Sequence, residues 1–220
     1  CGIGWMANSI AWHQKWDVTA IDFTPSAVAR ARNVSKALKV NVDFREVDLT
    51  EFEPENRFDV VYSLGVLHHT KDCIGALKRV LNRFVKPGGH AFIGLYHTYG
   101  RRPFLEHFSD LRDKGVDETG LYREFSKLHS KIKDVVQLRS WFRDQVLVPH
   151  ETQHTIEELL PVFDELGATL ISTSINQFAP YPVATLIIKQ EKAIEDYARK
   201  KLLKYQYFPG YFVFLLKARD

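Results

Sequence analysis

The sequence predicts an α/β fold built around a mainly parallel β-sheet. Short apolar strands alternate with amphipathic helices from residue 5 to residue 97, and the same alternation returns after residue 155. Strands and helices that alternate in this way form βα units with right-handed crossovers, which place the strands parallel to one another. The length of 220 residues suits one sizeable domain of this class that carries an insertion.

Individual elements follow from their local residue patterns. A helix is expected at 24–39, because Thr24 is a good N-cap and Pro25 lies where the first helical N–H has no partner. A second helix is expected at 73–85, where apolar residues form one stripe before the sequence KPGG ends it. The other predicted elements are a helix at 5–16 and strands at 17–22, 41–48, 57–64 and 90–97.

The alternation is interrupted between residues 98 and 150. This segment is helical in pattern, charged and aromatic, and it allows two interpretations: a solvated helical excursion, or a lid over the carboxyl edge of the sheet. After it come a helix at 155–167 with a capping box of Thr155 and Glu158, strands at 168–175 and 210–218, and a basic amphipathic helix at 189–205. We therefore predict a core at 1–97, a helical insertion at 98–150 and the C-terminal part of the same domain at 151–220.

Composition narrows the class of protein. The net charge is +3 with both signs interspersed, so the sequence gives no strong sign of nucleic-acid binding. No apolar run approaches the roughly 20 residues that a membrane-spanning helix needs. Cys1 and Cys73 are too few for a disulfide framework. These features predict a cytoplasmic protein, and no pattern indicates its oligomeric state.

The chain begins inside a glycine-rich turn, CGIG, of the kind that normally follows a strand. No strand or initiator Met precedes it, so we expect the chain to be a fragment of a longer protein. Gly2 and Gly4 precede the first predicted helix, and Asp22 ends the next strand. Such a turn lets a ligand approach backbone N–H groups, and a carboxylate at that strand end can accept hydrogen bonds from ribose hydroxyls. The letters GIGWMA also fit the G-x-G-x-x-A pattern of NAD-dependent oxidoreductases, which remain an alternative.

Four further motifs, in order and in register, add to the glycine turn. They are VTAIDFTPSAVARAR, VDFREVDLTEF, FDVVYSLGVLHHT and LKRVLNRFVKPGGHAFIGLYH. Together with CGIG they resemble the class I S-adenosylmethionine-dependent methyltransferases, above all the small-molecule methyltransferases with a GVLHH-type end of the fourth strand. The resemblance covers residues 1–97 well and 155–218 more loosely. It implies a Rossmann-like, doubly wound sheet of seven strands with an antiparallel last strand and a helical insertion after the fifth, the first strand being missing from this chain.

The resemblance also implies S-adenosylmethionine as the cofactor and gives roles to matching positions. The turn beside the methionine part of the cofactor would consist of Cys1, Gly2, Ile3 and Gly4. The other implied cofactor contacts are Asp22 at the ribose hydroxyls, Phe23 on the adenine, Asp48 with the Leu49 amide at the adenine amino edge, and Ser63, Leu64 and Gly65 on the methionine side. The acidic residue and first glycine that the family has before this turn lie outside the sequence, so the contact to the methionine amino group cannot be placed.

Methyl transfer from a sulfonium is an in-line displacement, so a general base is optional and no single residue type marks the site. Candidates follow the ends of the fourth and fifth strands of the family, where the sheet meets the insertion. They are His68, His69, Tyr96 and His97, with Arg101 and Arg102 as possible partners of an acidic acceptor. We expect the acceptor to be a small molecule. A methyltransferase-like module that binds the cofactor without turnover is a further alternative.

One motif points to different chemistry. His150, Glu151 and His154 form the His-Glu-x-x-His pattern of zinc metallopeptidases, which requires both imidazoles on one helix. Pro149 before the motif and the helix cap at Thr155 after it favour a loop instead, so we expect no metal there. We expect this loop to lie over the acceptor pocket, with His150 and Glu151 facing Tyr96 and His68. His150 and Glu151 are then candidates for orienting the acceptor or transferring a proton. The other possibility is a polar loop that only caps the next helix.

Overall fold

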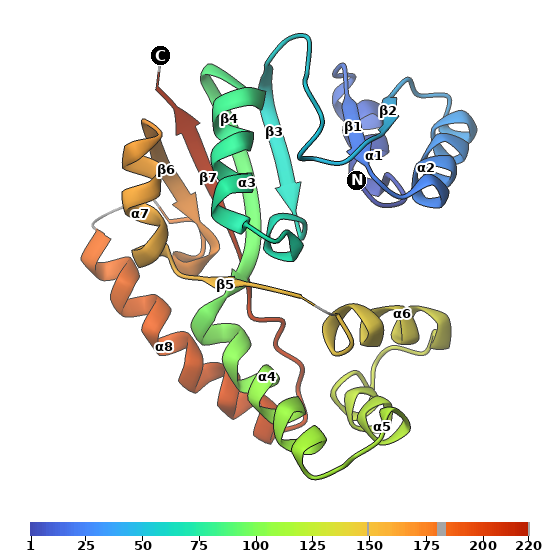
Figure 1. Ribbon diagram of the computed structural model, residues 1–220, viewed down its shortest axis with the longest axis vertical. Helices are drawn as coiled ribbons and strands as arrows, with labels where there is room; N and C mark the ends of the chain where they lie inside the picture. Colours follow the sequence, from blue (N-terminus) through green and yellow to red (C-terminus); the bar gives the residue numbers. More distant parts are fainter. Residues whose placement is uncertain (149, 180–183, 220) are drawn as a thin grey trace. The chain divides into compact units, whose positions relative to one another are not determined.

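The computed structural model of the chain describes residues 1–148, 150–179 and 184–219 (Figure 1). Contacts divide it into two compact units, residues 1–55 and residues 56–220. Each unit has its own sheet and helices, and each is described by itself below.

The first unit contains two βα repeats. Helix α1 (Trp5–Gln14) is followed by strand β1 (Thr19–Asp22), helix α2 (Pro25–Leu38) and strand β2 (Asp43–Glu46). The two strands pair in parallel, as a helical crossover requires. A small core joins the four elements, and its buried members are Ala7, Ala20, Val28, Ala31 and Phe44.

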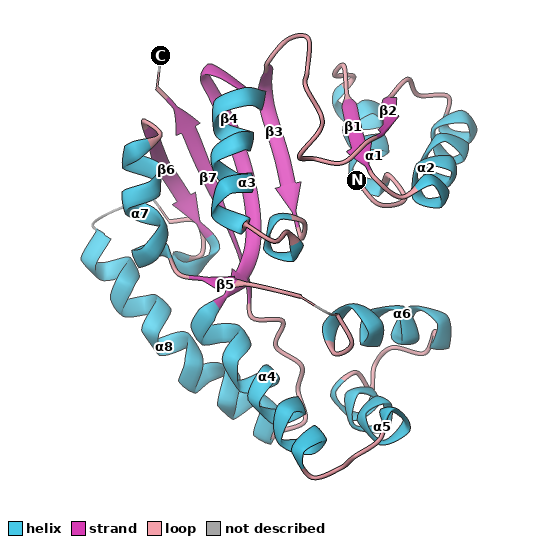
Figure 2. Ribbon diagram, in the orientation of Figure 1, coloured by secondary structure: helices cyan, strands magenta, loops and turns pink. Residues whose placement is uncertain are grey.

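The second unit is built on a mainly parallel sheet whose last strand is antiparallel (Figure 2). Its strand order is β3 (Phe58–Leu64), β4 (Val85–His97), β7 (Tyr211–Ala218) and β6 (Ala168–Thr173). Strands β3 and β4 run parallel, whereas β7 runs antiparallel to both of its neighbours. A two-residue strand, β5 (Gln153–His154), pairs in parallel with the carboxyl end of β4.

Helices and helical turns connect these strands. A 3₁₀ turn, η1 (Leu67–His69), follows β3 and leads to α3 (Cys73–Arg79), which continues into a π-helical turn, η2 (Val80–Phe84). Helix α7 (Ile156–Glu165) precedes β6, and a second 3₁₀ turn, η3 (Ser174–Asn176), follows it. Helix α8 (Ala184–Leu203) then leads back to β7.

Three helices form the insertion between β4 and β5. They are α4 (Thr98–Asp113), α5 (Glu118–Leu128) and α6 (Val135–Gln145), and α4 packs along α8 (Figure 1). The insertion has a hydrophobic core of its own, with Phe104, Phe108, Leu121, Phe125, Leu128, Leu138, Phe142 and Val146 buried. It is therefore a packed helical unit rather than a solvated loop.

The predicted fold class and the antiparallel last strand are confirmed, and most element boundaries lie within a few residues of their predicted positions. Strand β4 is longer than the predicted 90–97, and α8 begins before the predicted residue 189. Strand β5 was not predicted. Because the structure describes one sheet in each unit, the single seven-stranded sheet stays a prediction, and Pro149 lies outside the described residues.

Tyr211 crosses the sheet near its carboxyl edge. Its side chain passes from β7 over Gly94 of β4, and its hydroxyl forms a hydrogen bond with the backbone of Gly65 after β3. A Cβ atom at position 94 would overlap the Tyr211 hydroxyl. The absence of a side chain at Gly94 thus creates the space that lets Tyr211 connect β7 with the turn after β3.

Substitution Gly94→Ala should therefore destabilise the protein by about 1–3 kcal/mol, the usual cost of overpacking a tightly packed position. In a double-mutant cycle with Tyr211→Ala, the second change should recover part of this loss because it removes the group that the new methyl would meet. Urea denaturation of the four proteins measures the coupling; strictly additive losses would contradict the proposed contact.

Candidate functional site

The glycine turn and Asp22 contact each other in the first unit. The Asp22 carboxylate accepts hydrogen bonds from the Gly2 N–H (2.7 Å) through Oδ2 and from the Thr24 N–H (2.9 Å) through Oδ1. Burial raises the pKa of Asp22, but opposing contributions, among them the hydrogen bonds from Thr24 and Gly2, outweigh it and hold the pKa below its ordinary value. Asp22 is therefore an ionised acceptor at the end of β1, and it fixes the turn in place.

The two glycines of this turn have different surroundings. Gly4 adopts φ +74°, and a Cβ there would lie 2.7 Å from the Ala31 Cβ, so close packing of α1 on α2 requires glycine. Gly2 also has positive φ, but a Cβ there would meet nothing within 4 Å. The Gly2 position therefore leaves open space beside the turn, where a ligand could approach the backbone.

The other predicted cofactor residues of this unit differ in exposure. The Phe23 ring is 72% exposed and Ile3 is 52% exposed. Asp48 accepts hydrogen bonds from the Thr50 N–H (2.7 Å) and the Thr50 hydroxyl (2.6 Å), which lower its pKa below the ordinary value. Leu49 follows it in the loop after β2. The exposed Phe23 ring directly follows the Asp22 carboxylate in the sequence, and this pair suits the predicted contact with adenosine.

In the second unit, the predicted methionine-side residues form the carboxyl end of β3. Ser63 is buried and Leu64 is half-buried, and both belong to the strand. Gly65 follows it at φ +73°, with nothing within 4 Å of an added Cβ. Its N–H lies 3.3 Å from the Gly94 carbonyl oxygen. The Cα of Gly65 thus faces open space at the end of the sheet, and its left-handed φ favours glycine.

His68 lies beneath the surface in an aromatic cluster. Its ring is 4.2 Å from the Tyr96 ring and 4.3 Å from the His69 ring, and only 1% of His68 is exposed. Burial, with smaller contributions from the neighbouring His69, Arg101 and His154, lowers the pKa of His68 to about 3. His68 is therefore a neutral imidazole at ordinary pH and a weak base, because the site disfavours its cation.

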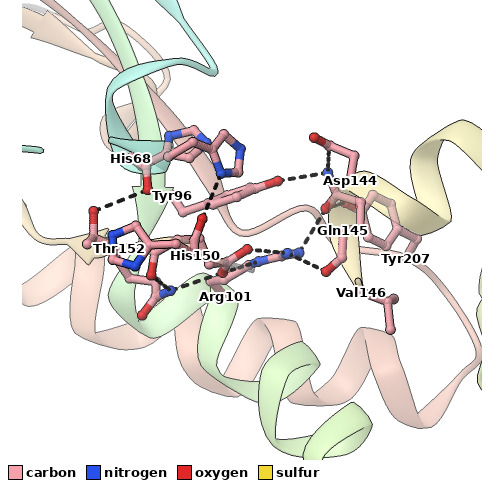
Figure 3. A network of polar contacts seen from close by, with 12 residues as sticks. His68, Tyr96, Arg101, Asp144, Gln145, Val146, His150, Thr152 and Tyr207 are labelled. Carbon is pink, nitrogen blue, oxygen red and sulfur yellow. Dashed lines mark hydrogen bonds and ion pairs between the residues drawn. The ribbon is translucent and has the colours of Figure 1, made fainter. Parts of the chain in front are cut away.

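Arg101 occupies the centre of a buried polar network (Figure 3). Its guanidinium forms a bidentate ion pair with Glu151, at 3.0 Å and 2.8 Å, and it lies 4.2 Å from the centre of the Tyr96 ring. Arg101 is fully buried and the Glu151 side chain is 8% exposed. Burial opposes the charge on Arg101, but Glu151 outweighs it and raises the Arg101 pKa. Arg101 and Glu151 therefore form a buried, bidentate ion pair.

Gln145, the last residue of α6, completes this network (Figure 3). Its Oε1 accepts from Arg101 (2.8 Å) and from the Tyr207 hydroxyl (2.7 Å), and its Nε2 donates to the Tyr96 hydroxyl (2.7 Å). Burial raises the pKa of Tyr96 to about 12 and also raises that of Tyr207. Both phenols are therefore protonated, and Tyr96 is a poor candidate for a base.

His97 is also held by structural contacts. Its Nδ1 accepts from the Gly100 N–H (3.3 Å), and its Nε2 lies 3.1 Å from Glu191 of α8. An imidazole whose Nδ1 accepts must carry its proton on Nε2, so His97 donates to Glu191. The Glu191 carboxylate also accepts from the Ile156 and Glu157 N–H groups at the start of α7 (2.7 and 3.1 Å). These contacts join β4, α7 and α8.

The loop with the His-Glu-x-x-His pattern is extended and lies against the carboxyl edge of the sheet. The Thr152 N–H donates to the His68 carbonyl oxygen at 2.8 Å, and β5 pairs with the last residues of β4. His150 and His154 share no helix, so the helical pitch that a zinc peptidase needs is absent. Among the described residues, no group of three or more His, Cys, Asp or Glu side chains could hold a metal.

His69 and His150 are the more accessible histidines at this edge. The His69 Nδ1 lies 3.2 Å from the His150 carbonyl oxygen, and the His150 Nε2 lies 3.1 Å from the Thr70 carbonyl oxygen. A carbonyl can only accept, so these nitrogens carry protons, and each neutral ring keeps a lone pair on its other nitrogen. By geometry, His69 and His150 are better placed for proton transfer than His68, His97, Tyr96 or Glu151.

Several residues of the site give little signal in the sequence. Buried or partly buried contacts at the sheet edge are made by Gln145, Tyr207, Tyr211 and Glu191. Glu191 and Gln145 lie on helices where exposed polar residues are common, so only the tertiary structure shows their burial. Arg101 and Arg102, expected as partners of an acidic acceptor, are instead paired with Glu151 and Glu195, at 2.8 Å each.

Comparison with known proteins identifies the class to which this fold belongs. Residues 1–89 match the family model of a methyltransferase domain. This match confirms the resemblance to class I methyltransferases that the sequence predicted.

Curated relatives match about half of this chain, whereas a solved structure matches all of it. The chain is 32% identical over 118 residues to phosphoethanolamine N-methyltransferase 3 of Arabidopsis thaliana, covering 53% of this chain and 24% of that protein. It is 34% identical over 105 residues to ubiquinone biosynthesis O-methyltransferase of Alkalilimnicola ehrlichii, covering 47% and 40%. The fold of PKMT2 from Rickettsia typhi, solved with AdoHcy, covers 100% of this chain and 49% of that chain at a TM-score of 0.67 and 14% identity.

The chain thus spans 24% and 40% of the lengths of these two relatives. Among the residues that the structure describes, helices of the length and apolarity needed to cross a membrane are absent.

The two neighbouring arginines of α4 allow a matched test of the buried network. Glu151→Gln leaves the Arg101 guanidinium buried without a counter-charge and should destabilise the protein by about 3–5 kcal/mol. Glu195→Gln removes a partner of Arg102, whose side chain is 42% exposed. The control should cost about 0–1 kcal/mol. Urea denaturation measures both, and equal effects would contradict a special role of the buried pair.

The buried His68 should make stability depend on pH. The folded-state pKa of about 3 lies below the ordinary 6.5, so between these values the unfolded chain binds the extra proton. Stability should therefore fall as pH drops through this window, by up to about 1.4 kcal/mol per pH unit from His68 alone. In the His68→Gln variant, the free energy of unfolding should decrease less steeply as the pH falls. Urea midpoints from pH 7 to pH 4 measure the slopes, and identical slopes would contradict the depressed pKa.

Proposed function

We propose that this protein is an S-adenosylmethionine-dependent methyltransferase that acts on a small-molecule acceptor. The observation that carries the proposal is the contact of the glycine turn with the Asp22 carboxylate in a stretch that matches the methyltransferase domain family. Two relatives of different acceptor class, an N-methyltransferase and an O-methyltransferase, support the reaction type without fixing the methylated atom.

The residues of the first unit suit an adenosine. Asp22 is ionised and can accept hydrogen bonds from ribose hydroxyls, the exposed Phe23 ring offers a surface for the adenine, and the space beside Gly2 lets a ligand reach the backbone. For Gly65, in the second unit, the methionine-side role that the sequence implies stays a proposal, which the open space beside its Cα supports. S-adenosylmethionine, when bound, supplies a methyl group on a positively charged sulfur, which is already an activated leaving group.

The residues of this chain would then orient the acceptor and exclude water. The insertion and the loop at His150 are proposed to act as the lid over the acceptor, with β5 fixing the loop to the end of β4. Where the acceptor must lose a proton, His69 and His150 are proposed to receive it, because both have accessible rings with one lone pair. The two free cysteines, Cys1 and Cys73, support a reducing, cytoplasmic location.

Calorimetry with S-adenosylhomocysteine tests this function, and Asp22→Asn provides the informative variant. The change keeps the shape of the side chain but removes the charge, so affinity should fall by about tenfold or more, as expected for a hydrogen bond to a charged group. Asp43→Asn, on the exposed face of the adjacent β2, is the matched control and should bind like wild type.

NADH, titrated in parallel by its fluorescence, separates the alternative. Binding of NADH without binding of S-adenosylhomocysteine would favour an oxidoreductase and overturn the proposal. Absence of S-adenosylhomocysteine binding by the wild-type protein would also overturn it.

A further inference from the structure

A groove of about 630 Å³ lies in the second unit, at the carboxyl edge of the sheet. It runs between α8, the turn η3 after β6, and the segment that leads into β7. Its volume falls in the range of small-molecule sites. The described residues that line it are His97, Ser174, Ile175, Asn176, Gln177, Gln190, Ala193, Ile194, Tyr197, Phe208, Gly210, Tyr211 and Phe212.

The lining is aromatic and aliphatic, with neutral polar groups. Tyr197 and Phe208 meet edge to face at 5.3 Å, and Tyr197 is 50% exposed, so its ring is accessible to a ligand. Three carboxamides and the Ser174 hydroxyl supply hydrogen-bonding groups. The Ser174 oxygen accepts from the Val213 N–H at 3.0 Å, which leaves its own hydroxyl proton to donate.

Charge is scarce around the groove. Among its described lining residues there is no Lys, Arg, Asp or Glu. His97, which does line it, is 1% exposed and donates to Glu191, so it has no free charge to offer. An anionic ligand would therefore lose its hydration without gaining a cationic partner, which is unfavourable.

The groove also reaches the part of the sheet edge that we assign to the cofactor. Tyr211 lines it and, by crossing Gly94, forms a hydrogen bond with the backbone of Gly65. Gly65 belongs to the turn after β3 that the proposed function places on the methionine side. A molecule bound in the groove would thus share one side chain, Tyr211, with the proposed cofactor site.

From these observations we infer that the groove binds the methyl acceptor, and that the acceptor is a neutral, planar aromatic molecule with hydroxyl groups. This inference rests on the proposed methyltransferase function. The acceptor hydroxyl oxygen would form a bond to the methyl carbon while the carbon–sulfur bond breaks and its electron pair goes to sulfur. The hydroxyl proton passes to a base or to water, and the products are the aryl methyl ether and S-adenosylhomocysteine. A phosphorylated acceptor, such as the name of one relative indicates for that protein, does not fit this lining.

Two matched ligands and two matched variants test the inference. The ligands are a vicinal dihydroxynaphthalene, which is neutral and fluorescent, and its monosulfonate, which adds only a negative charge. The variants are Ala193→Trp, which fills the groove from α8, and Lys200→Trp, an equally large change at an exposed α8 position outside the groove. Binding is measured by fluorescence and by calorimetry, with S-adenosylhomocysteine titrated into every sample.

The neutral diol should bind wild type and Lys200→Trp equally. Its affinity for Ala193→Trp should be lower by about tenfold or more, because the tryptophan fills the groove. The sulfonate should bind wild type about tenfold or more weakly than the diol, because its charge finds no partner. Affinity for S-adenosylhomocysteine should stay the same in all three proteins.

Suppose that wild type binds S-adenosylhomocysteine. If it then binds the sulfonate or phosphoethanolamine better than the diol, or if Ala193→Trp does not change the affinity for the diol, the inference about the groove is wrong and the proposed function stands. If wild type fails to bind S-adenosylhomocysteine, the proposed function itself fails.

Discussion

One buried charge, the guanidinium of Arg101, determines how the second unit is held together. It comes from α4, and its partners are Glu151 in the loop before β5, Gln145 at the end of α6 and the ring of Tyr96 at the end of β4. Each contact joins a different segment to the same cation. Because a buried cation is costly unless it is fully paired, these segments must all be in place for the charge to be tolerated.

The position of the accessible histidines depends on this arrangement. Glu151 fixes the loop that contains His150, and the backbone carbonyl of His150 orients the ring of His69. The polar groups within the unit are held in single protonation states, neutral for His68 and protonated for Tyr96. Interior side chains therefore provide fixed geometry, and the groups able to exchange protons lie at the rim.

Local patterns in the sequence account for most of the fold. Alternating strands and helices predict the α/β class, and the cap at Thr155 correctly places the start of α7, where its hydroxyl accepts from the Glu158 N–H. Strand β5 could not be predicted because two residues carry no periodicity, and Glu151 could not be matched with Arg101 because 50 residues separate them. The groove depends on side chains from three distant segments, which no local pattern reveals.

The insertion of helices α4 to α6 has a hydrophobic interior of its own, and it is attached to the rest of the unit through polar contacts such as those of Arg101, Arg102 and Gln145. Such a module can exchange most of its surface and internal residues during evolution without disturbing the sheet, as long as the attachment points persist. The same property makes the insertion a natural unit for grafting between related proteins.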